Sequence, residues 1–181
     1  MNPHPILVHF PIALLSVYSI FELLRFKGLL KQESWFNIKA VLVVLGAVGA
    51  VAAVFTGDFA RQAVYTGNGT GYPGLDLPTI IRAHENWAHI TAVVFVLLAC
   101  AYIVAFANKF NFINFLPGQL LKGIWKFGTW IEKMLIETPL VIFLALFGLC
   151  AITITGALGG IIVYGPNIDP VAHLVYGLLI H

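Results

Sequence analysis

The amino-acid sequence predicts an all-α integral membrane protein whose four spanning helices form a bundle. Of its 181 residues, 60 % are hydrophobic and only 10 % are charged, whereas an ordinary soluble domain carries about 25 % charged residues. Four apolar stretches are each long enough to cross a bilayer as a helix, which takes about 20 residues. The basic residues lie between these stretches in an uneven distribution. This composition excludes an ordinary globular or disordered chain, and the net charge of +2 gives no basis for nucleic-acid binding.

The predicted spans cover residues 5–24, 40–59, 79–107 and 138–164, within a membrane domain over residues 1–165. No basic residue precedes the first apolar run and no small-residue cleavage site follows it, so we expect it to be a retained span rather than a signal peptide. Spans two and four contain closely spaced small residues, which let helix backbones approach each other. These residues are Gly46, Gly49, Ala50 and Ala53 in span two, and Gly148, Gly156, Gly159 and Gly160 in span four.

The positions of Lys and Arg predict how the spans are oriented. Eight of the ten basic residues lie in the segments between spans one and two and between spans three and four, and only Arg61 and Arg82 lie between spans two and three. Because cytoplasmic loops carry the excess of Lys and Arg, we expect both termini to be periplasmic or extracellular, in a bacterial inner (cytoplasmic) membrane. Glu22 and Arg25, at the cytoplasmic end of span one, are expected to form a surface pair.

Two segments outside the spans are also predicted to be helical. In residues 110–136, apolar residues recur at helical spacing and alternate with Lys122, Lys126 and Lys133. This pattern is typical of an amphipathic helix that lies in the membrane interface, here on the cytoplasmic side with anionic membrane lipids as its partner. Residues 166–181 are predicted to form a short helix on the outer side.

The chain carries one pattern twice, which predicts two tandem two-helix repeats. In each half, a His-x4-His pair opens an apolar span, a basic segment follows, and the next span contains Thr-Gly. Repeats that run in the same direction are related by an axis along the membrane normal. The matching residues are His4, His9, Thr56 and Gly57 in the first half, and His84, His89, Thr155 and Gly156 in the second.

The four paired histidines are the candidate metal ligands. They lie at or just below the outer interface, where an ionisable side chain is by default a functional candidate, and imidazole binds haem iron, Cu and Zn. Residues five apart on a helix point about 140° apart, so neither His4 and His9 nor His84 and His89 are expected to bind one metal ion together. This geometry favours one or two haem b groups held between spans one and three, for example by His4 with His89 and by His9 with His84.

Prolines near the start of span one leave the position of its first histidine open. The helix could begin at Pro5 or at Pro11, or it could be kinked at Pro11. If it began at Pro11, His4 would lie in an extended segment and the angular estimate would not apply to it.

Charged residues near the outer face could pair with haem propionates or orient the histidine ligands. Arg61 and Arg82 lie at the ends of spans, where haem propionates would emerge, and Arg–carboxylate pairing is favourable there. Plain anchoring at the interface is the alternative. Asp58 and Glu85 could orient a ligating histidine through its second ring nitrogen, or simply be solvated.

Three segments resemble the motifs of a known family. The opening His4-Pro-Ile-Leu-Val-His9-Phe-Pro-Ile-Ala-Leu-Leu and the closing Thr155-Gly-Ala-Leu-Gly-Gly-Ile-Ile-Val-Tyr164-Gly are similar to those of the bacterial membrane family catalogued as domain of unknown function 2231. His84-x-x-Trp87 resembles its central histidine motif. The resemblance covers about residues 3–165 and includes His4, His9 and His84. It implies a four-helix membrane bundle and, because members occur fused to Rieske-type or c-type cytochrome modules, electron transfer with haem.

The sequence therefore predicts a b-type cytochrome-like subunit rather than an enzyme. Its iron would exchange electrons near the outer face with other redox subunits, a periplasmic carrier or quinone, in a respiratory or photosynthetic complex. No C-x-x-C-H motif is present, so covalent haem is not expected. One alternative is an outer-face Cu- or Zn-binding or transport protein, although no chain of polar residues runs through the spans. A non-redox structural subunit of a larger membrane complex is the other.

Overall fold

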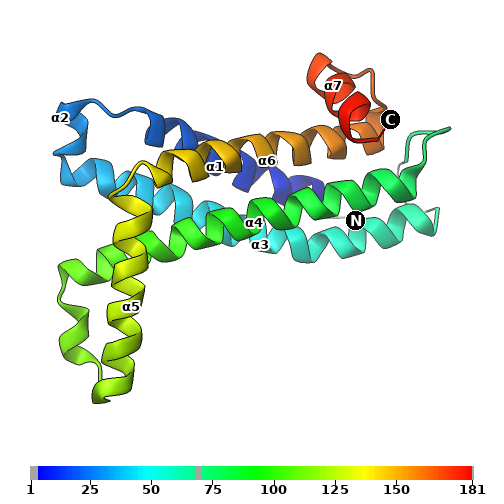
Figure 1. The fold of residues 1–181 in the computed structure, drawn as a ribbon. Coiled ribbons are helices and arrows are strands. Elements are labelled where there is room, and N and C mark those ends of the chain that lie inside the picture. Colours follow the sequence, from blue (N-terminus) through cyan, green and yellow to red (C-terminus); the bar gives the residue numbers. More distant parts are fainter. Residues whose placement is uncertain (1–3, 68–70, 181) are drawn as a thin grey trace.

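The computed structural model describes residues 4–67 and 71–180, and every regular element in this part of the chain is a helix (Figure 1). Four of the helices are long and apolar enough to span a membrane, which confirms the predicted four-span, all-α membrane protein. The elements are α1 (His4–Leu23), α2 (Lys27–Leu30), α3 (Glu33–Tyr65), α4 (Leu77–Lys109), η1 (Phe112–Phe115), α5 (Gly118–Ile136), α6 (Leu140–Tyr164) and α7 (Pro170–Leu179).

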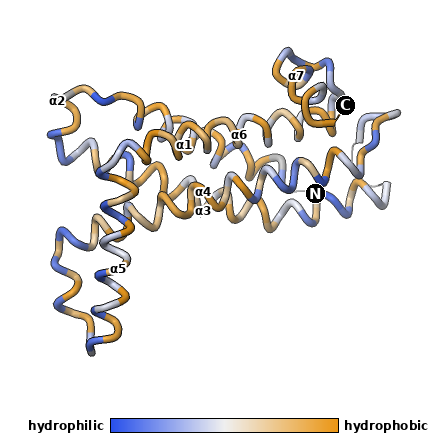
Figure 2. Tube along the Cα trace, viewed as in Figure 1, coloured by the Kyte–Doolittle hydropathy of each residue, from blue (hydrophilic) through white to orange (hydrophobic). Residues whose placement is uncertain are grey.

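The four long helices form one bundle in which α1, α3, α4 and α6 follow one another around a ring. As a result, α1 lies diagonally opposite α4, and α3 lies diagonally opposite α6. The start of α1, the α3–α4 connection and α7 lie toward one end of the bundle, and α2 and α5 lie at the other (Figure 1). We call the first the histidine end, because it contains His4 and His84, and the second the lysine end. Figure 2 shows apolar residues along the bundle and hydrophilic residues concentrated toward its ends and along α5.

Helices α3 and α4 both extend beyond the apolar stretches that predicted them. The side chain of Asp76 caps the start of α4, where its carboxylate accepts hydrogen bonds from the backbone N–H of Thr79 at 3.5 Å and from the Thr79 hydroxyl at 2.6 Å. Gly67, which follows the end of α3, has a φ of +73°, a left-handed conformation that glycine adopts without strain. These local signals, rather than hydropathy, set where the two helices end.

Helix α1 begins at His4 and continues through Pro11, so a helix start at Pro11, one of the alternatives left open by the sequence, is wrong. Proline is accommodated here because α3 presents a glycine to it. A β-carbon on Gly49 would lie 3.3 Å from Cδ of Pro11 and 3.0 Å from the ring of Phe10. The small residue therefore lets the two helices approach closely where one of them contains proline.

A buried polar cluster lies toward the lysine end. The Glu22 carboxylate accepts a hydrogen bond from Lys39 Nζ at 3.0 Å and another from the Tyr102 hydroxyl. Glu22 is only 2 % exposed and Lys39 only 8 %, so the expected surface pair of Glu22 with Arg25 is wrong. Packing explains the difference, because α3 and α4 bring Lys39 and Tyr102 to the inward face of α1, whereas Arg25 lies beyond the helix end.

The centre of the bundle is aromatic and tightly packed around Tyr18. Its ring makes edge-on contacts with Phe95 and Tyr102, with centroids 6.2 and 5.8 Å apart, and all three side chains are fully buried. Gly148 of α6 lies directly under the Phe95 ring. A β-carbon at Gly148 would approach Phe95 Cζ to 2.6 Å, closer than real side chains come.

We therefore expect Gly148→Ala to lower the free energy of unfolding by about 1–3 kcal/mol, the usual cost of overpacking a filled core. The Phe95 ring cannot yield easily, because Tyr18 contacts it edge-on. Gly156→Ala is the matched control on the same helix, since a β-carbon there meets nothing within 4 Å and alanine favours the helix. Denaturant titration in mixed micelles measures both. Equal stability of the two variants would contradict the packing argument.

Helix α5 projects sideways from the bundle at the lysine end (Figure 1). It is fastened to the end of α4 by the indole of Trp125, which donates to the Asn108 side-chain oxygen at 2.9 Å, and by Thr129, whose hydroxyl accepts from the Asn108 amide at 3.3 Å. Glu132 is buried at this junction, and its burial raises the pKa of the carboxyl.

Candidate functional site

The candidate site lies at the histidine end, where helices on opposite corners of the bundle each contribute one histidine. His4 is the first residue of α1, and His84 lies in the second turn of α4. Both imidazoles are half-buried. His4 on α1 contacts Thr56 on α3, and His84 on α4 contacts Thr155 on α6. The site therefore involves all four spanning helices.

The backbone of α6 fixes the tautomer of His84. Nδ1 of this ring lies 2.9 Å from the carbonyl oxygen of Thr155. A carbonyl oxygen only accepts hydrogen bonds, so Nδ1 must carry the proton and donate it. In the neutral imidazole the lone pair then resides on Nε2. Metal-ligating histidines are held in this way, with one ring nitrogen donating to a carbonyl and the other available as a ligand.

The hydroxyl of Thr56 selects the same tautomer for His4. Thr56 Oγ1 donates its single hydrogen toward the carbonyl oxygens of Ala52 and Ala53, each 3.1 Å away. With the hydroxyl hydrogen on these carbonyls, the 3.0 Å contact with His4 Nδ1 is one in which the imidazole donates. The lone pair of His4 consequently also belongs to Nε2, as in His84.

Glycines lie beneath both histidine rings. A β-carbon on Gly159 of α6 would lie 3.3 Å from Cε1 of His84, and one on Gly57 of α3 would lie 3.7 Å from Cε1 of His4. Glycine thus leaves room for each ring to lie against the neighbouring helix. The sequence identifies Thr56 and Thr155 as matching positions of a repeat and does not predict their contacts with the histidines. The repeat could have indicated these contacts, because each Thr-Gly pair lies at the same end of the bundle as a pair of histidines.

The other two predicted ligands lie on the outer surface of their helices. His9 and His89 are both exposed, and Nδ1 of His89 donates to the backbone oxygen of Glu85 on its own helix at 2.7 Å. This placement agrees with the angle of about 140° between residues five apart on a helix. At the histidine end, His4 and His84 thus each contact a neighbouring spanning helix, whereas His9 and His89 lie on the exposed side of their own helices.

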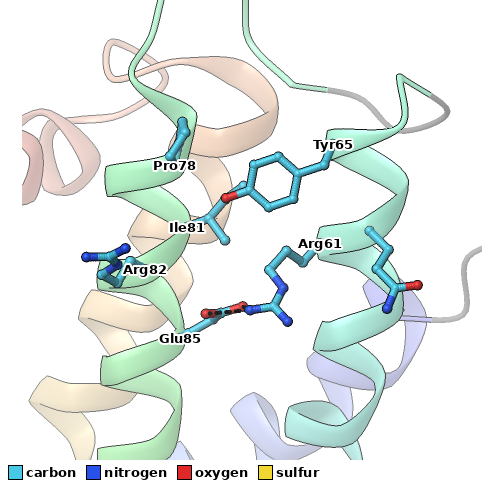
Figure 3. Close-up of a pocket in the computed structure, with 7 residues that line it drawn as sticks. Arg61, Tyr65, Pro78, Ile81, Arg82 and Glu85 are labelled. Carbon is cyan, nitrogen blue, oxygen red and sulfur yellow. Dashed lines mark hydrogen bonds and ion pairs between the residues drawn. The ribbon is translucent and has the colours of Figure 1, made fainter.

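The two arginines line a pocket between the ends of α3 and α4. Figure 3 shows Arg61 reaching from α3 to Glu85 on α4, while Arg82 points away from Arg61. Arg61 forms ion pairs with Glu85 at 3.3 Å and with Asp58 at 3.1 Å. Both carboxylates therefore contact an arginine rather than a histidine ring. The pocket is lined by Arg61, Gln62, Tyr65, Pro78, Ile81, Arg82 and Glu85.

The nitrogen donors that face neighbouring helices at the histidine end are two imidazoles, those of His4 and His84. Among residues 4–67 and 71–180, no three His, Cys, Asp or Glu side chains lie together in a group that could hold a metal ion, whereas structural Zn sites take four protein ligands and catalytic ones take three. Haem brings four nitrogens of its own and needs only axial ligands from the protein. Two histidines with Nε2 lone pairs, supplied by facing helices, match that requirement.

Comparison with known proteins places the chain in a family without adding a substrate. The family model described as "Predicted membrane protein (DUF2231)" matches residues 2–170, which include His4, His84 and both threonines. No curated protein and no solved structure matches the chain.

Proposed function

The chain belongs to the DUF2231 family of predicted membrane proteins, and from this premise and the geometry of the histidine end we propose that it is an electron-transfer subunit. In this proposal, His4 and His84 are the axial ligands of one haem b group. The observation that carries it is the pair of hydrogen bonds from Nδ1 to Thr56 and Thr155, which leaves the lone pair of both rings on Nε2.

The residues of the chain orient the ligands. The carbonyl oxygen of Thr155 and the hydroxyl of Thr56 hold the rings in one orientation and one tautomer, because each accepts the Nδ1 proton. Gly159 lets the His84 ring lie against α6, and the apolar spans exclude water. When bound, haem supplies a one-electron ferric/ferrous couple. Two axial histidines leave no open position on the iron, so this site supports electron transfer rather than oxygen or substrate chemistry.

The repeat is part of the proposal. The contact of α1 with α3 through His4 and Thr56 has its counterpart in that of α4 with α6 through His84 and Thr155. This equivalence supports two tandem two-helix units related by an axis along the bundle. It also explains why the two ligands come from diagonally opposite helices.

The distribution of charge supports an orientation with the histidine end outside. Eight of the ten basic residues lie at the lysine end, and the positive-inside rule assigns that end to the cytoplasm. The haem would then lie near the outer face of a bacterial inner membrane. Electrons would pass to or from a periplasmic carrier, quinone or neighbouring redox subunits. Arg82 is the proposed propionate partner, because Arg61 is already paired with two carboxylates.

An absorption spectrum of the purified protein, produced with ample haem, tests the proposal. We expect a Soret band and a sharp α-band on reduction, both lost in His4→Ala and in His84→Ala. His9→Ala and His89→Ala are matched controls from the same two helices and should keep the spectrum, because their side chains are exposed. Wild-type protein without a Soret band, or full haem content in both His4→Ala and His84→Ala, would overturn the proposal. Stoichiometric Cu or Zn without haem would favour the metal-binding alternative.

A further inference from the structure

Helix α5 carries an apolar face that the rest of the chain does not cover. Leu120 is 78 % exposed, and Ile124, Phe127 and Trp130 are 60–62 % exposed. At 100° per residue these side chains fall on one side of the helix. The side that holds Trp125, Thr129 and Glu132 contacts the bundle, as does Leu135 near the end of the helix. An apolar surface of this kind, on a helix beside four membrane spans, requires a non-aqueous neighbour.

The lysines of α5 form a single row that borders this apolar face. Lys122, Lys126 and Lys133 lie within about 40° of one another around the helix axis, and the row is about 16 Å long. Lys126 and Lys133 are exposed and Lys122 is half-buried. None of the three makes an ion pair within the part of the chain that the structure describes.

The two carboxylates of α5 do not neutralise this row. Glu132 is buried against the end of α4, and Glu137 follows the last residue of the helix. Two other lysines near this end form ion pairs, Lys39 with Glu22 and Lys109 with Glu33. In contrast, the row on α5 is a set of cations that form no ion pair among the residues that the structure describes.

The direction of α5 matches the plane of a membrane surface. The four spanning helices run along the bundle, and α5 runs across their direction at the lysine end (Figure 1). With the bundle across a bilayer, α5 lies along the surface, with aromatic and aliphatic side chains on one face and a row of lysines beside it. This is the arrangement of an interfacial helix, in which long Lys side chains reach the headgroups.

We propose that α5 is a docking helix for anionic phospholipids, whose headgroup phosphates are bound by Lys122, Lys126 and Lys133. Charge complementarity selects this occupant over a zwitterionic surface, because the lysine row forms no ion pair with an acidic residue in residues 4–67 and 71–180. The apolar face, with Phe127 and Trp130, inserts among the acyl chains of the same leaflet. The inference does not depend on haem or on the histidine end.

Quenching of tryptophan fluorescence by brominated lipid tests the proposal on the full chain. Trp35→Phe with Trp87→Phe leaves Trp125 and Trp130 of α5 as the reporters. In nanodiscs of phosphatidylcholine, we expect added brominated phosphatidylglycerol to quench at a much lower lipid fraction than brominated phosphatidylcholine. Each lysine changed to glutamine should weaken this preference about fivefold, as the loss of one cation near an anionic surface does. Raising the salt concentration should also weaken the preference for phosphatidylglycerol in the protein that keeps all three lysines.

The control variant is Arg25→Gln with Lys31→Gln, which removes exposed cations from the same end of the bundle but not from α5. It should leave the preference for phosphatidylglycerol unchanged. Equal quenching by both lipids, or a preference that survives both high salt and Lys122→Gln/Lys126→Gln/Lys133→Gln, would overturn the proposal. The salt titration needs no variant in the row, so it decides the matter even if the triple variant does not fold.

Discussion

Replacing Lys39 by methionine is expected to lower the free energy of unfolding by about 3–5 kcal/mol, the cost of removing one partner from a buried ion pair. Glu22 would remain 2 % exposed, with the Tyr102 hydroxyl but without a cation. A buried carboxylate without its counter-charge is strongly disfavoured in an apolar bundle. Unfolding in mixed micelles with increasing denaturing detergent measures the change.

A second ion pair in the same protein supplies the control. Lys109 pairs with Glu33 at 3.2 Å, but Glu33 is 75 % exposed at its side chain, so Lys109→Met should cost less than about 1 kcal/mol. Adding Glu22→Gln to Lys39→Met should recover most of the lost stability, because the unpaired charge is then gone. Equal free energies of unfolding for Lys39→Met and Lys109→Met would show that burial does not increase the contribution of the Glu22–Lys39 pair to stability.

Gly159→Leu is expected to weaken haem binding at the histidine site. The new β-carbon alone would lie 3.3 Å from Cε1 of His84, so the ring has to shift away from α6 to make room for the side chain. Overpacking by about 1–3 kcal/mol corresponds to a haem affinity lowered about tenfold to a hundredfold. Haem content per protein, read from the Soret band, measures the loss.

The adjacent Gly160 is the control for this substitution. It lies on the same helix, and a β-carbon there meets nothing within 4 Å, so Gly160→Leu should retain haem. The nitrogen NMR shifts of His84 give a readout that does not require haem, because displacement of the ring from the Thr155 carbonyl changes the environment of Nδ1. Equal haem contents and unchanged His84 shifts in Gly159→Leu would show that the ring does not depend on this glycine.

The spans could be predicted from the sequence because hydropathy over about 20 residues is a strong local signal. The site could be predicted only in part. His4 and His84 stood out as ionisable residues near apolar spans, but so did His9 and His89, and sequence spacing treats the two pairs alike. Burial separates them. His4 and His84 face the neighbouring helices, whereas His9 and His89 lie on the outer surface.

The sequence by itself determined the fold class, the four spans and the amphipathic character of α5, because each depends on the order of apolar and charged residues along the chain. Only the tertiary structure decided which polar groups meet. It turned Glu22 from a surface residue into the partner of Lys39 and Tyr102, and it made Thr56 and Thr155 the residues that set the histidine tautomers. These contacts join helices far apart in sequence, with separations of 17 to 80 residues, and arise from how the helices pack around one another.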